Sequence, residues 1–483
     1  MNDYLFPPFS LTFPLNQTGN ISAKMVGSKR LFTGLALTSS CLAQVIRDPG
    51  VYGPPLELVH LYNDEWPTGI AVSSTGRMFS NYPGGLDAND TNNGSNGKYT
   101  VAELTSNTTE TPYPSAEMNN PPGGSINYTT TPATGANYAD YFIGVQSVVI
   151  DSADRLWVLD TGRATQPNGT LVNAVRGGPK LVGINLSNNT VFQTIIFPDT
   201  VAFPETYLND VRFDLRTNIT ASGKGVAYIT DSSSQGRTGL IIVDLGTGES
   251  WRHLDLSEYV QPDRQFLAYV WGKPLYGNNP GGPAGFLSFG ADGIALSADG
   301  DTLYFGGVGN RYMFSVPTAR LRARGPTSEL LAQASTTSVT QKGLADGFET
   351  DSNDFIYHGN MENNAISFFN PANGTDQTFV RDPRISWADT VCCNHHLLSS
   401  RHHTSPALFL SVRTTTTTTT TSAQVIRPHS SHLPGTNNQV DVTLFSCPSP
   451  PTDTCTSPTT SSPSGRRSTR APTRASGPLD CSE

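Results

Sequence analysis

Short apolar runs alternate with polar turns along the chain between about residue 59 and residue 390. Each unit has an apolar run, a turn rich in Ser, Asp, Asn or Gly, and a second run that contains an aromatic residue. Five units follow this order: TGIAVSSTGRMFSNY from Thr68, QSVVIDSADRLWVLDTG from Gln146, DVRFDLRTN…GKGVAYITDSS from Asp210, DGIALSADGDTLYFGG from Asp292 and DGFETDSNDFIYHGN from Asp346. Runs of this length around tight turns are typical of β-hairpins. The pattern therefore predicts an all-β chain made of repeated hairpins.

The spacing of the units indicates how the hairpins assemble. Successive units begin about 40 to 80 residues apart, which suits the blade repeat of a β-propeller with loop insertions. A sixth unit begins with SWADT, where Asp389 takes the leading position, but no further strand pattern follows Thr390. We therefore expect a six-bladed β-propeller whose last blade is incomplete and whose ring is strained or open.

The composition changes abruptly after Thr390. Six of the nine His and five of the six Cys lie beyond it, and residues 414–421 are an unbroken Thr tract. The motif CCNHH from Cys392 offers zinc ligands, but it lacks the paired CxxC or HxxxH spacing of zinc sites. We interpret residues 391–483 as a disordered, low-complexity tail that comes from an unspliced intron or a shifted reading frame. A natural, mucin-like O-glycosylated tail is the alternative.

Residues 25–43 have the order of a secretory signal peptide. From Met25 the chain reads MVGSKRLFTGLALTSSCLAQ, with a basic pair, a short apolar core and small residues before a cleavage point. A buried helix start is the alternative interpretation. The signal interpretation makes residues 1–24 a misassigned extension, begins the mature protein at Gln44 and assigns residues 44–390 to the propeller domain.

Cysteine usage and glycosylation motifs agree with secretion. No Cys occurs between Gln44 and Val391, so the propeller needs no disulfide framework in an oxidising compartment. The motif Asn-x-Ser/Thr marks acceptor sites for N-linked glycans in surface loops. It occurs in the expected mature chain at Asn89, Asn93, Asn107, Asn127, Asn168, Asn185, Asn188, Asn218 and Asn373.

Charge and missing motifs exclude several classes of function. The net charge of -9 speaks against a nucleic-acid partner, because phosphate binding needs a basic face. No apolar run reaches the roughly 18 residues that a membrane span requires. The nucleophile elbow Gly-x-Ser-x-Gly, the Walker loop and the motif His-Glu-x-x-His do not occur. We therefore expect an extracellular protein with a small-molecule ligand and no familiar catalytic motif; the sequence does not indicate an oligomeric state.

Several stretches of the repeats resemble the major royal jelly protein/yellow family, above all its secreted fungal members. The resemblance covers about Val59 to Thr390 and rests on WPTGIAVSSTGRMFSNYPGGLD, VQSVVIDSADRLWVLDTGR, LNDVRFDL, YITDSS, DGIALSADGDTLYF, DGFETDSNDFIYHGNMENNAI and WADT. It implies a six-bladed propeller and an extracellular protein, although the strand pair that the family has after WADT is missing. Insect members are linked to dopachrome conversion, to nutrition and to the binding of small aromatic amines. Because a fold does not fix an activity, the resemblance alone assigns none to this chain.

The residues that precede the first strand of each unit form a candidate ligand site. In a propeller these positions surround one mouth of the central channel. The register of the repeats brings to that mouth Thr68, Gln146, Asp210, Asp292, Asp346 and Asp389. Carboxylates around one opening attract a cation or an amine, which Asn209 and Gln146 would orient by neutral hydrogen bonds. No Lys or Arg shares this column, so we expect a bound cation, or protonation, to relieve the repulsion.

Two other interpretations of the same residues stay open. Each Asp at a strand start can instead cap local backbone groups. The residues also suit a metal-dependent lactonase of the gluconolactonase/regucalcin type: Asn209 and Asp210 are similar to the substrate-side pair of that class, and Asp292 and Asp346 would stand at two of its metal positions. The ion would be calcium or another divalent cation. Thr68 stands where that class has a glutamate, which leaves the anionic ligand set incomplete.

The tryptophans divide into two groups. Trp66, Trp157, Trp251 and Trp271 are expected to pack between blades rather than to stack on a ligand, and Trp271 is the one for which a second interpretation stays open. Trp271 lies in the Gly/Pro-rich stretch YVWGKPLYGNNPGGPAG, a loop that could overhang the channel.

Overall fold

The computed structural model describes residues 50–63, 65–86, 99–277, 283–394, 407–415 and 421–428 of the 483-residue chain. The extension, the signal peptide, the sequons at Asn89 and Asn93, the His cluster of residues 395–403 and residues 429–483 of the tail lie outside the described residues. In the described part strands predominate, and helices are limited to two short α-helices and one 3-10 turn. This confirms the prediction of an all-β propeller fold.

Five four-stranded antiparallel sheets are each formed by one continuous run of chain, as propeller blades are. The first blade contains β2 (Gly69–Val72), β3 (Met78–Asn81), β4 (Val101–Leu104) and β5 (Glu110–Pro112). The second contains β8 (Val145–Ile150), β9 (Arg155–Thr161), β10 (Pro179–Asn185) and β11 (Thr190–Ile196). The third contains β12 (Leu208–Asp214), β13 (Val226–Asp231), β14 (Gly239–Asp244) and β15 (Ser250–His253). The fourth contains β18 (Ala291–Leu296), β19 (Thr302–Gly307), β20 (Tyr312–Pro317) and β21 (Thr337–Gln341), and the fifth β22 (Phe348–Thr350), β23 (Ile356–Asn360), β24 (Ala365–Asn370) and β25 (Thr375–Arg381).

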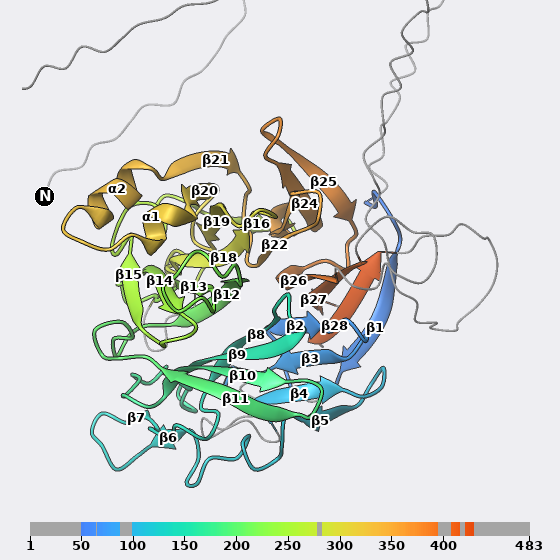
Figure 1. Cartoon of the computed structure of the whole chain (residues 1–483). Coiled ribbons are helices and arrows are strands. Elements are labelled where there is room, and N and C mark those ends of the chain that lie inside the picture. The colour runs from blue at the N-terminus through green and yellow to red at the C-terminus, as the bar shows by residue number, and fades with distance from the viewer. Residues whose placement is uncertain are drawn as a thin grey trace, which may run out of the picture. The chain divides into compact units, whose positions relative to one another are not determined.

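A further four-stranded sheet joins the two ends of the described chain (Figure 1). It contains β26 (Trp387–Asn394), β27 (Ala407–Thr415) and β28 (Thr421–Pro428), and β1 (Leu56–Tyr62) pairs antiparallel with β28 at its edge. The expectation that no strand follows Thr390 is therefore wrong, because β26 continues past it and two more strands pair with β26 and with each other. Each of the five blades above comes from one continuous run of chain, whereas the sequence predicts six. The last sheet is not left incomplete, because an N-terminal strand completes it.

The first strands of the sheets form a closed ring. Contacts run from β2 to β8, β12, β18 and β22 in turn and then to β26, which contacts β2 again. The expectation of an open ring is therefore also wrong. Side chains at the starts of these strands converge on one axis because the strands surround it.

Apolar side chains fill the spaces between neighbouring sheets. Trp157 of β9 is buried and stacks on Phe213 of β12 with ring centroids 5.0 Å apart. Its indole N–H donates to the Asp151 carboxylate at 2.7 Å, so the one polar atom of the ring is satisfied. The same cluster includes Leu208 of β12 and Ile241 of β14. The expectation that Trp157 packs between blades is confirmed.

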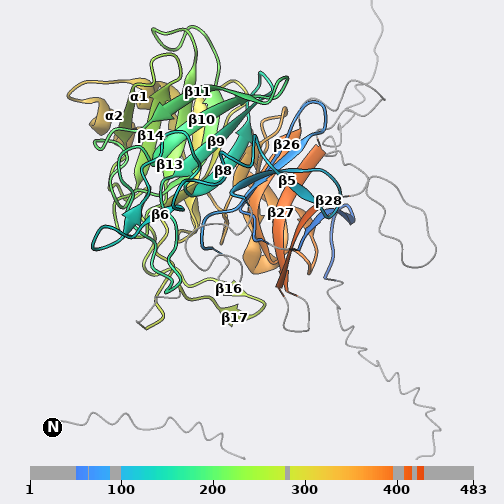
Figure 2. The same cartoon turned by 90° about the horizontal axis from the view of Figure 1, so that it is seen from below.

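Three insertions and one 3-10 turn depart from the blade pattern. The short strands β6 (Ile126–Asn127) and β7 (Thr134–Gly135) follow the first blade, and the hairpin of β16 (Tyr269–Val270) and β17 (Lys273–Pro274) precedes the fourth. Helices α1 (Thr318–Arg322) and α2 (Ser328–Ala334) separate β20 from β21, and the 3-10 turn η1 (Met361–Asn363) follows β23. Figure 2 shows the β16–β17 hairpin extending away from the blades. Neither helix in the described ranges is long and apolar enough to cross a membrane.

Candidate functional site

The column of residues predicted from the repeats lines one small cavity. The lining residues are Thr68, Gln146, Ser147, Asn209, Asp210, Asp292, Asp346, Gly347, Asp389 and Thr390. All six column positions and Asn209 are among them. The free volume is about 10 Å³, which is about the room that one water molecule needs. The repeat register therefore brings these residues together, while their role in binding stays a prediction.

β-Bulges at the site disturb the regular pleat of the first strands. In four sheets the pairing of the first strand shifts register within a stretch that contains a column residue. Those residues are Gln146, Asp210, Asp292 and Asp389. A bulge bends its strand and re-aims the side chains at the extra residue. The hairpin pattern predicts the strands but gives no signal for the bulges, so the sequence alone does not explain how the side chains converge.

Asp210 already has a cationic partner within the chain. Arg212 Nη1 lies 2.9 Å from Asp210 Oδ2, and Ser147 Oγ donates to Asp210 Oδ1 at 2.8 Å. Arg212 is itself buried and also contacts the Phe348 carbonyl and, at 3.6 Å, Glu349. The expectation that no Arg serves the column is therefore wrong. The signal was available, because residues two apart on a strand share a face.

Asp292 and Asp346 form the acidic core of the cavity. Both carboxyl groups line the same small cavity. Asn209 Nδ2 donates to Asp292 Oδ2 at 2.7 Å, and Trp387 Nε1 donates to Asp346 Oδ2 at 2.7 Å. Burial raises the pKa of Asp292 well above its usual range, and the charge of Asp346, its hydrogen bond and the charge of Asp389 raise it further. Two carboxyl groups so placed retain a shared proton where an isolated Asp would be ionised.

Lys342 supplies a second internal cation near this pair. The side chain is buried, and Nζ donates to the carbonyls of Gly307 at 2.9 Å, Asn310 at 2.7 Å and Gly343 at 3.2 Å. Burial lowers the pKa of Lys342 to about 7, while the charges of Asp292 and Asp346 act in the opposite direction. Three carbonyl acceptors match the three N–H groups of an ammonium. These carbonyls oppose the effect of burial, and the ammonium form moderates the negative potential without filling the cavity.

The neutral side chains of the cavity hold one another across the ring. Thr68 Oγ1 donates to the Gln146 carbonyl at 3.0 Å, and Thr390 Oγ1 donates to the Thr68 carbonyl at 2.5 Å. Tyr207 donates its phenolic O–H to Gln146 Oε1 at 2.8 Å. Burial raises the pKa of Tyr207, so the phenol stays neutral and keeps donating. Thr68 and Gln146 therefore connect neighbouring blades, and Tyr207, which the sequence analysis missed, fixes the Gln146 amide.

The side chains of the cavity provide few of the ligands that a metal ion needs. Among the described residues, no group of three His, Cys, Asp or Glu side chains is arranged to hold a metal ion. Asp292 and Asp346 provide two carboxyl groups, and Thr68 adds no charge. Cys392, from the proposed zinc motif, packs against an apolar cluster, and burial raises the pKa of its thiol to about 12. A thiol that stays protonated is not the thiolate that zinc binds.

Trp271 lies away from this cavity. It occupies the turn of the β16–β17 hairpin, is 50% exposed and is not among the cavity residues. Ser147, Gly347 and Thr390 line the cavity but were not predicted. Each directly follows a column residue in the sequence, which is the signal that could have found them.

Comparison with known proteins identifies relatives of the chain. A family model described as major royal jelly protein matches residues 143–414, more than half of the chain and past Thr390 into β27. Major royal jelly protein 7 of Apis mellifera is 23% identical over 237 residues, a match that covers 47% of this chain and 47% of that protein. The chain thus matches about half the length of that relative.

Solved structures with a similar arrangement are more distant in sequence. A gluconolactonase from Xanthomonas campestris has a TM-score of 0.41 and 11% identity, covering 80% of this chain and 99% of its own. A calcium-binding regucalcin from Agrobacterium tumefaciens has a TM-score of 0.40 and 9% identity, covering 78% and 98%. At these values the similarity says nothing about activity.

Proposed function

This chain belongs to the major royal jelly protein family, and from that premise we propose that it is a secreted glycoprotein that binds a small cation, or the ammonium head of an amine, at its central carboxylates. The observation that carries the proposal is that Asp292 and Asp346 line one small cavity where the first strands meet, where burial and the charge of Asp346 raise the pKa of Asp292. Two buried carboxyl groups in contact repel each other once both are ionised. A cation can replace the shared proton and balance both charges, whereas an anion or a neutral molecule cannot.

The size of the cavity narrows the ligand. A free volume of about 10 Å³ suits a bare ion or an ammonium group, at about the room of one water molecule. The aromatic part of an amine such as serotonin or dopamine would have to lie outside. Tyr207 and Trp387 hydrogen-bond to cavity residues and would be the nearest aromatic side chains to receive it. Asp210 is paired with Arg212, so it would help to position the ligand but would not supply a net negative charge.

Calorimetric titration tests this proposal. Calcium chloride, ammonium chloride, serotonin and dopamine are titrated into the full chain at pH 7. Asp346→Asn should weaken the binding of a cation at least about tenfold, because one buried charge pair is worth more than 1.4 kcal/mol. Asp199→Asn, at an exposed position between β11 and β12, is the matched control and should bind as the parent does. Equal affinity of parent and Asp346→Asn would move the site elsewhere.

A divalent-metal-dependent lactonase is the alternative function. The contact of Asn209 with Asp292 favours it, because it brings a residue of the expected substrate-side pair next to one of the expected metal positions. This hypothesis requires hydrolysis of a lactone that depends on added calcium or zinc and is lost in Asp292→Asn. Metal binding without any turnover across a panel of aldonolactones would exclude it and leave the binding function.

Secretion and glycosylation make a separate part of the proposal. The seven sequons of the described part are at exposed or half-exposed positions. In five of them the Asn side-chain oxygen accepts the backbone N–H of the Ser or Thr two residues on. Surface turns of this kind give a glycosyltransferase access. Mass spectrometry of the secreted protein should find Gln44 as the first residue and glycans on these Asn residues; an intact signal segment on bare protein would contradict this.

The sheet that joins the two ends of the described chain sets the end of the proposed propeller domain. We take the sheet of β26, β27, β28 and β1 as the sixth blade, so the propeller domain ends at or after Pro428 instead of Thr390. The segments 1–24 and 25–43 keep their proposed roles as extension and signal peptide.

A further inference from the structure

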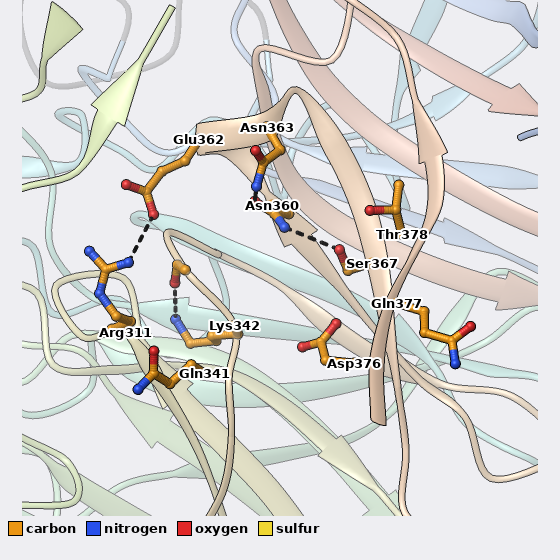
Figure 3. Close-up of a pocket in the computed structure, with 11 residues that line it drawn as sticks. Arg311, Gln341, Lys342, Asn360, Glu362, Asn363, Ser367, Asp376, Gln377 and Thr378 are labelled. Atoms are coloured by element: carbon orange, nitrogen blue, oxygen red, sulfur yellow. Dashed lines mark hydrogen bonds and ion pairs between the residues drawn. The ribbon is translucent and has the colours of Figure 1, made fainter. Parts of the chain in front are cut away.

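A second and larger cavity lies between the fourth and fifth blades (Figure 3). Its volume is about 290 Å³, and it shares no residue with the central cavity. Residues Gln341–Gly343 at the end of β21 form one wall, and β23, β24, β25 and η1 form the other. Apart from Gly343, each lining residue carries a polar or charged side chain. A pocket of this composition recognises its ligand by hydrogen bonds and offers an apolar molecule nothing to pack against.

The wall from the fifth blade places hydrogen-bond donors and acceptors side by side. Asn363 donates to Asn360 Oδ1 at 2.9 Å, and Asn360 donates to Ser367 Oγ at 3.2 Å. The Asp376 carboxylate points into the pocket and is held from behind by the buried His358, whose Nε2 lies 2.9 Å from Asp376 Oδ2. A carboxylate accepts several hydrogen bonds at once, so its other oxygen retains the capacity to accept from a ligand.

The charges of the pocket balance one another. Arg311 lies over the Phe266 ring at 4.4 Å, with its guanidinium 3.7 Å from the Glu362 carboxylate. Lys342 gives its N–H groups to three backbone carbonyls. Arg311, and Lys342 in its ammonium form, therefore accompany two carboxylates, Glu362 and Asp376. This balance suits a ligand without net charge that can both donate and accept hydrogen bonds.

Two exposed aromatic residues, Tyr269 and Trp271, belong to the hairpin that contacts η1 beside the pocket. The β16–β17 hairpin contacts η1, and the backbone N–H of Tyr269 donates to Glu362 Oε1 at 3.2 Å. Tyr269 and Trp271 are each 50% exposed. Trp271 has a φ of 55° and Gly272 a φ of 70°, the left-handed pair of a tight hairpin turn that favours Asn or Gly. A bulky side chain in that conformation is strained, and such strain marks functional positions.

We propose that this pocket binds a carbohydrate, with one sugar unit in the pocket and the next unit against the rings of Tyr269 and Trp271. Each sugar hydroxyl donates and accepts a hydrogen bond, as the amides, hydroxyls and carboxylate of the lining do. The C–H faces of a pyranose pack on exposed aromatic rings. A volume of about 290 Å³ lies at the lower end of the range of small-molecule pockets, which suits one sugar unit. The same chemistry serves a free sugar and the terminal unit of a glycan.

The test measures sugars in two forms on the full chain. Calorimetry uses glucose, galactose, mannose, N-acetylglucosamine and their disaccharides, and an array presents the same units at the ends of immobilised glycans. We expect a disaccharide to bind more tightly than its monosaccharide. Binding to the array alone would assign the pocket to glycan chains. Binding in both experiments would assign it to free sugars as well as to glycan chains. Failure of every sugar in both arms would overturn the proposal.

Variants locate the binding. Trp271→Asn suits the turn and so preserves folding; it should weaken the disaccharide about threefold to tenfold, the effect of one aromatic contact, and the monosaccharide less. Tyr128→Asn removes an equally exposed ring, 57% exposed in the β6–β7 insertion, and is the matched control. Gln341→Ala and Ser367→Ala should weaken both sugars, with thermal melting to confirm that they fold. Binding that survives both of these changes lies elsewhere and would also overturn the proposal.

Discussion

Replacing Asp292 by Asn should remove much of the pH dependence of stability below neutral pH. Burial and the neighbouring Asp346 raise the pKa of Asp292 in the folded protein, whereas the unfolded value is about 3.9. Between these two values the folded protein binds more protons than the unfolded chain. The stabilisation from this group is therefore complete below about pH 4 and is lost as the pH rises towards the folded pKa.

The size of the effect follows from proton linkage. Each extra proton on the folded state changes the free energy of unfolding by about 1.4 kcal/mol per pH unit. Between pH 5 and pH 7 the parent should lose up to about 3 kcal/mol from this group, and Asp292→Asn should lose none of it. Lys342 acts in a different range: its pKa is lowered to about 7, so its linkage raises stability with pH only above about 7.

Urea denaturation at pH 5, 6 and 7 measures this slope for the parent, for Asp292→Asn and for the exposed control Asp199→Asn. The control should keep the slope of the parent, and the dependence of unfolding on urea should stay the same in all three, so that midpoints report stability. Parallel pH profiles for the parent and Asp292→Asn would refute the shared-proton account of the pair.

Three further predictions concern the ion pair of Asp210, the turn of the β16–β17 hairpin and the strand β1. Arg212→Met leaves the buried Asp210 carboxylate without its cationic partner and should destabilise the fold by about 3–5 kcal/mol. Adding Asp210→Asn should recover most of this loss, as measured by urea denaturation. A double variant that is no more stable than Arg212→Met would contradict the ion pair. Trp271→Asn relieves a φ of 55° and should stabilise the protein by about 1 kcal/mol in thermal melting, whereas a loss would mean that the ring packs on the hairpin. Removing the chain through Tyr62 exposes the edge of β28 and should cause self-association, detected by light scattering. A truncated protein with the parent's mass and melting temperature would show that β1 does not protect that edge.

The sequence predicts the repeated part of the molecule well because its signals are local. A hairpin needs only two apolar runs and a turn, and each of the five units contains all three. The column follows from the register of the units, which is why Thr68, Asp292 and Asp389 line one cavity although they are far apart in the chain. The resemblance to the family, recognised on the same stretches, is confirmed by the family match over residues 143–414.

The features that the sequence did not predict depend on long-range pairing or on irregular backbone. β27 and β28 flank a Thr tract that is typical of low complexity, and the strand that completes their sheet, β1, lies more than 350 residues earlier. The apolar and polar positions of β27 and β28 give no local sign of that partner strand. The bulges that re-aim Gln146 and Asp210 leave no mark on the apolar pattern. The pairing of Arg212 with Asp210 is a different case, because the two residues share a face of β12 and that local signal was overlooked.

Proton release on cation binding is the most direct test of the central claim, that a cation takes the place of the proton shared by Asp292 and Asp346. Calcium is titrated into the full chain at pH 7 in two buffers with different ionisation enthalpies, and the difference in measured heat gives the number of protons released. The account predicts release of about one proton per bound ion, because a coupled carboxyl pair gives up its shared proton when a cation balances both charges, and a smaller release in Asp346→Asn. No binding of calcium, or binding with the same heat in both buffers, would contradict it.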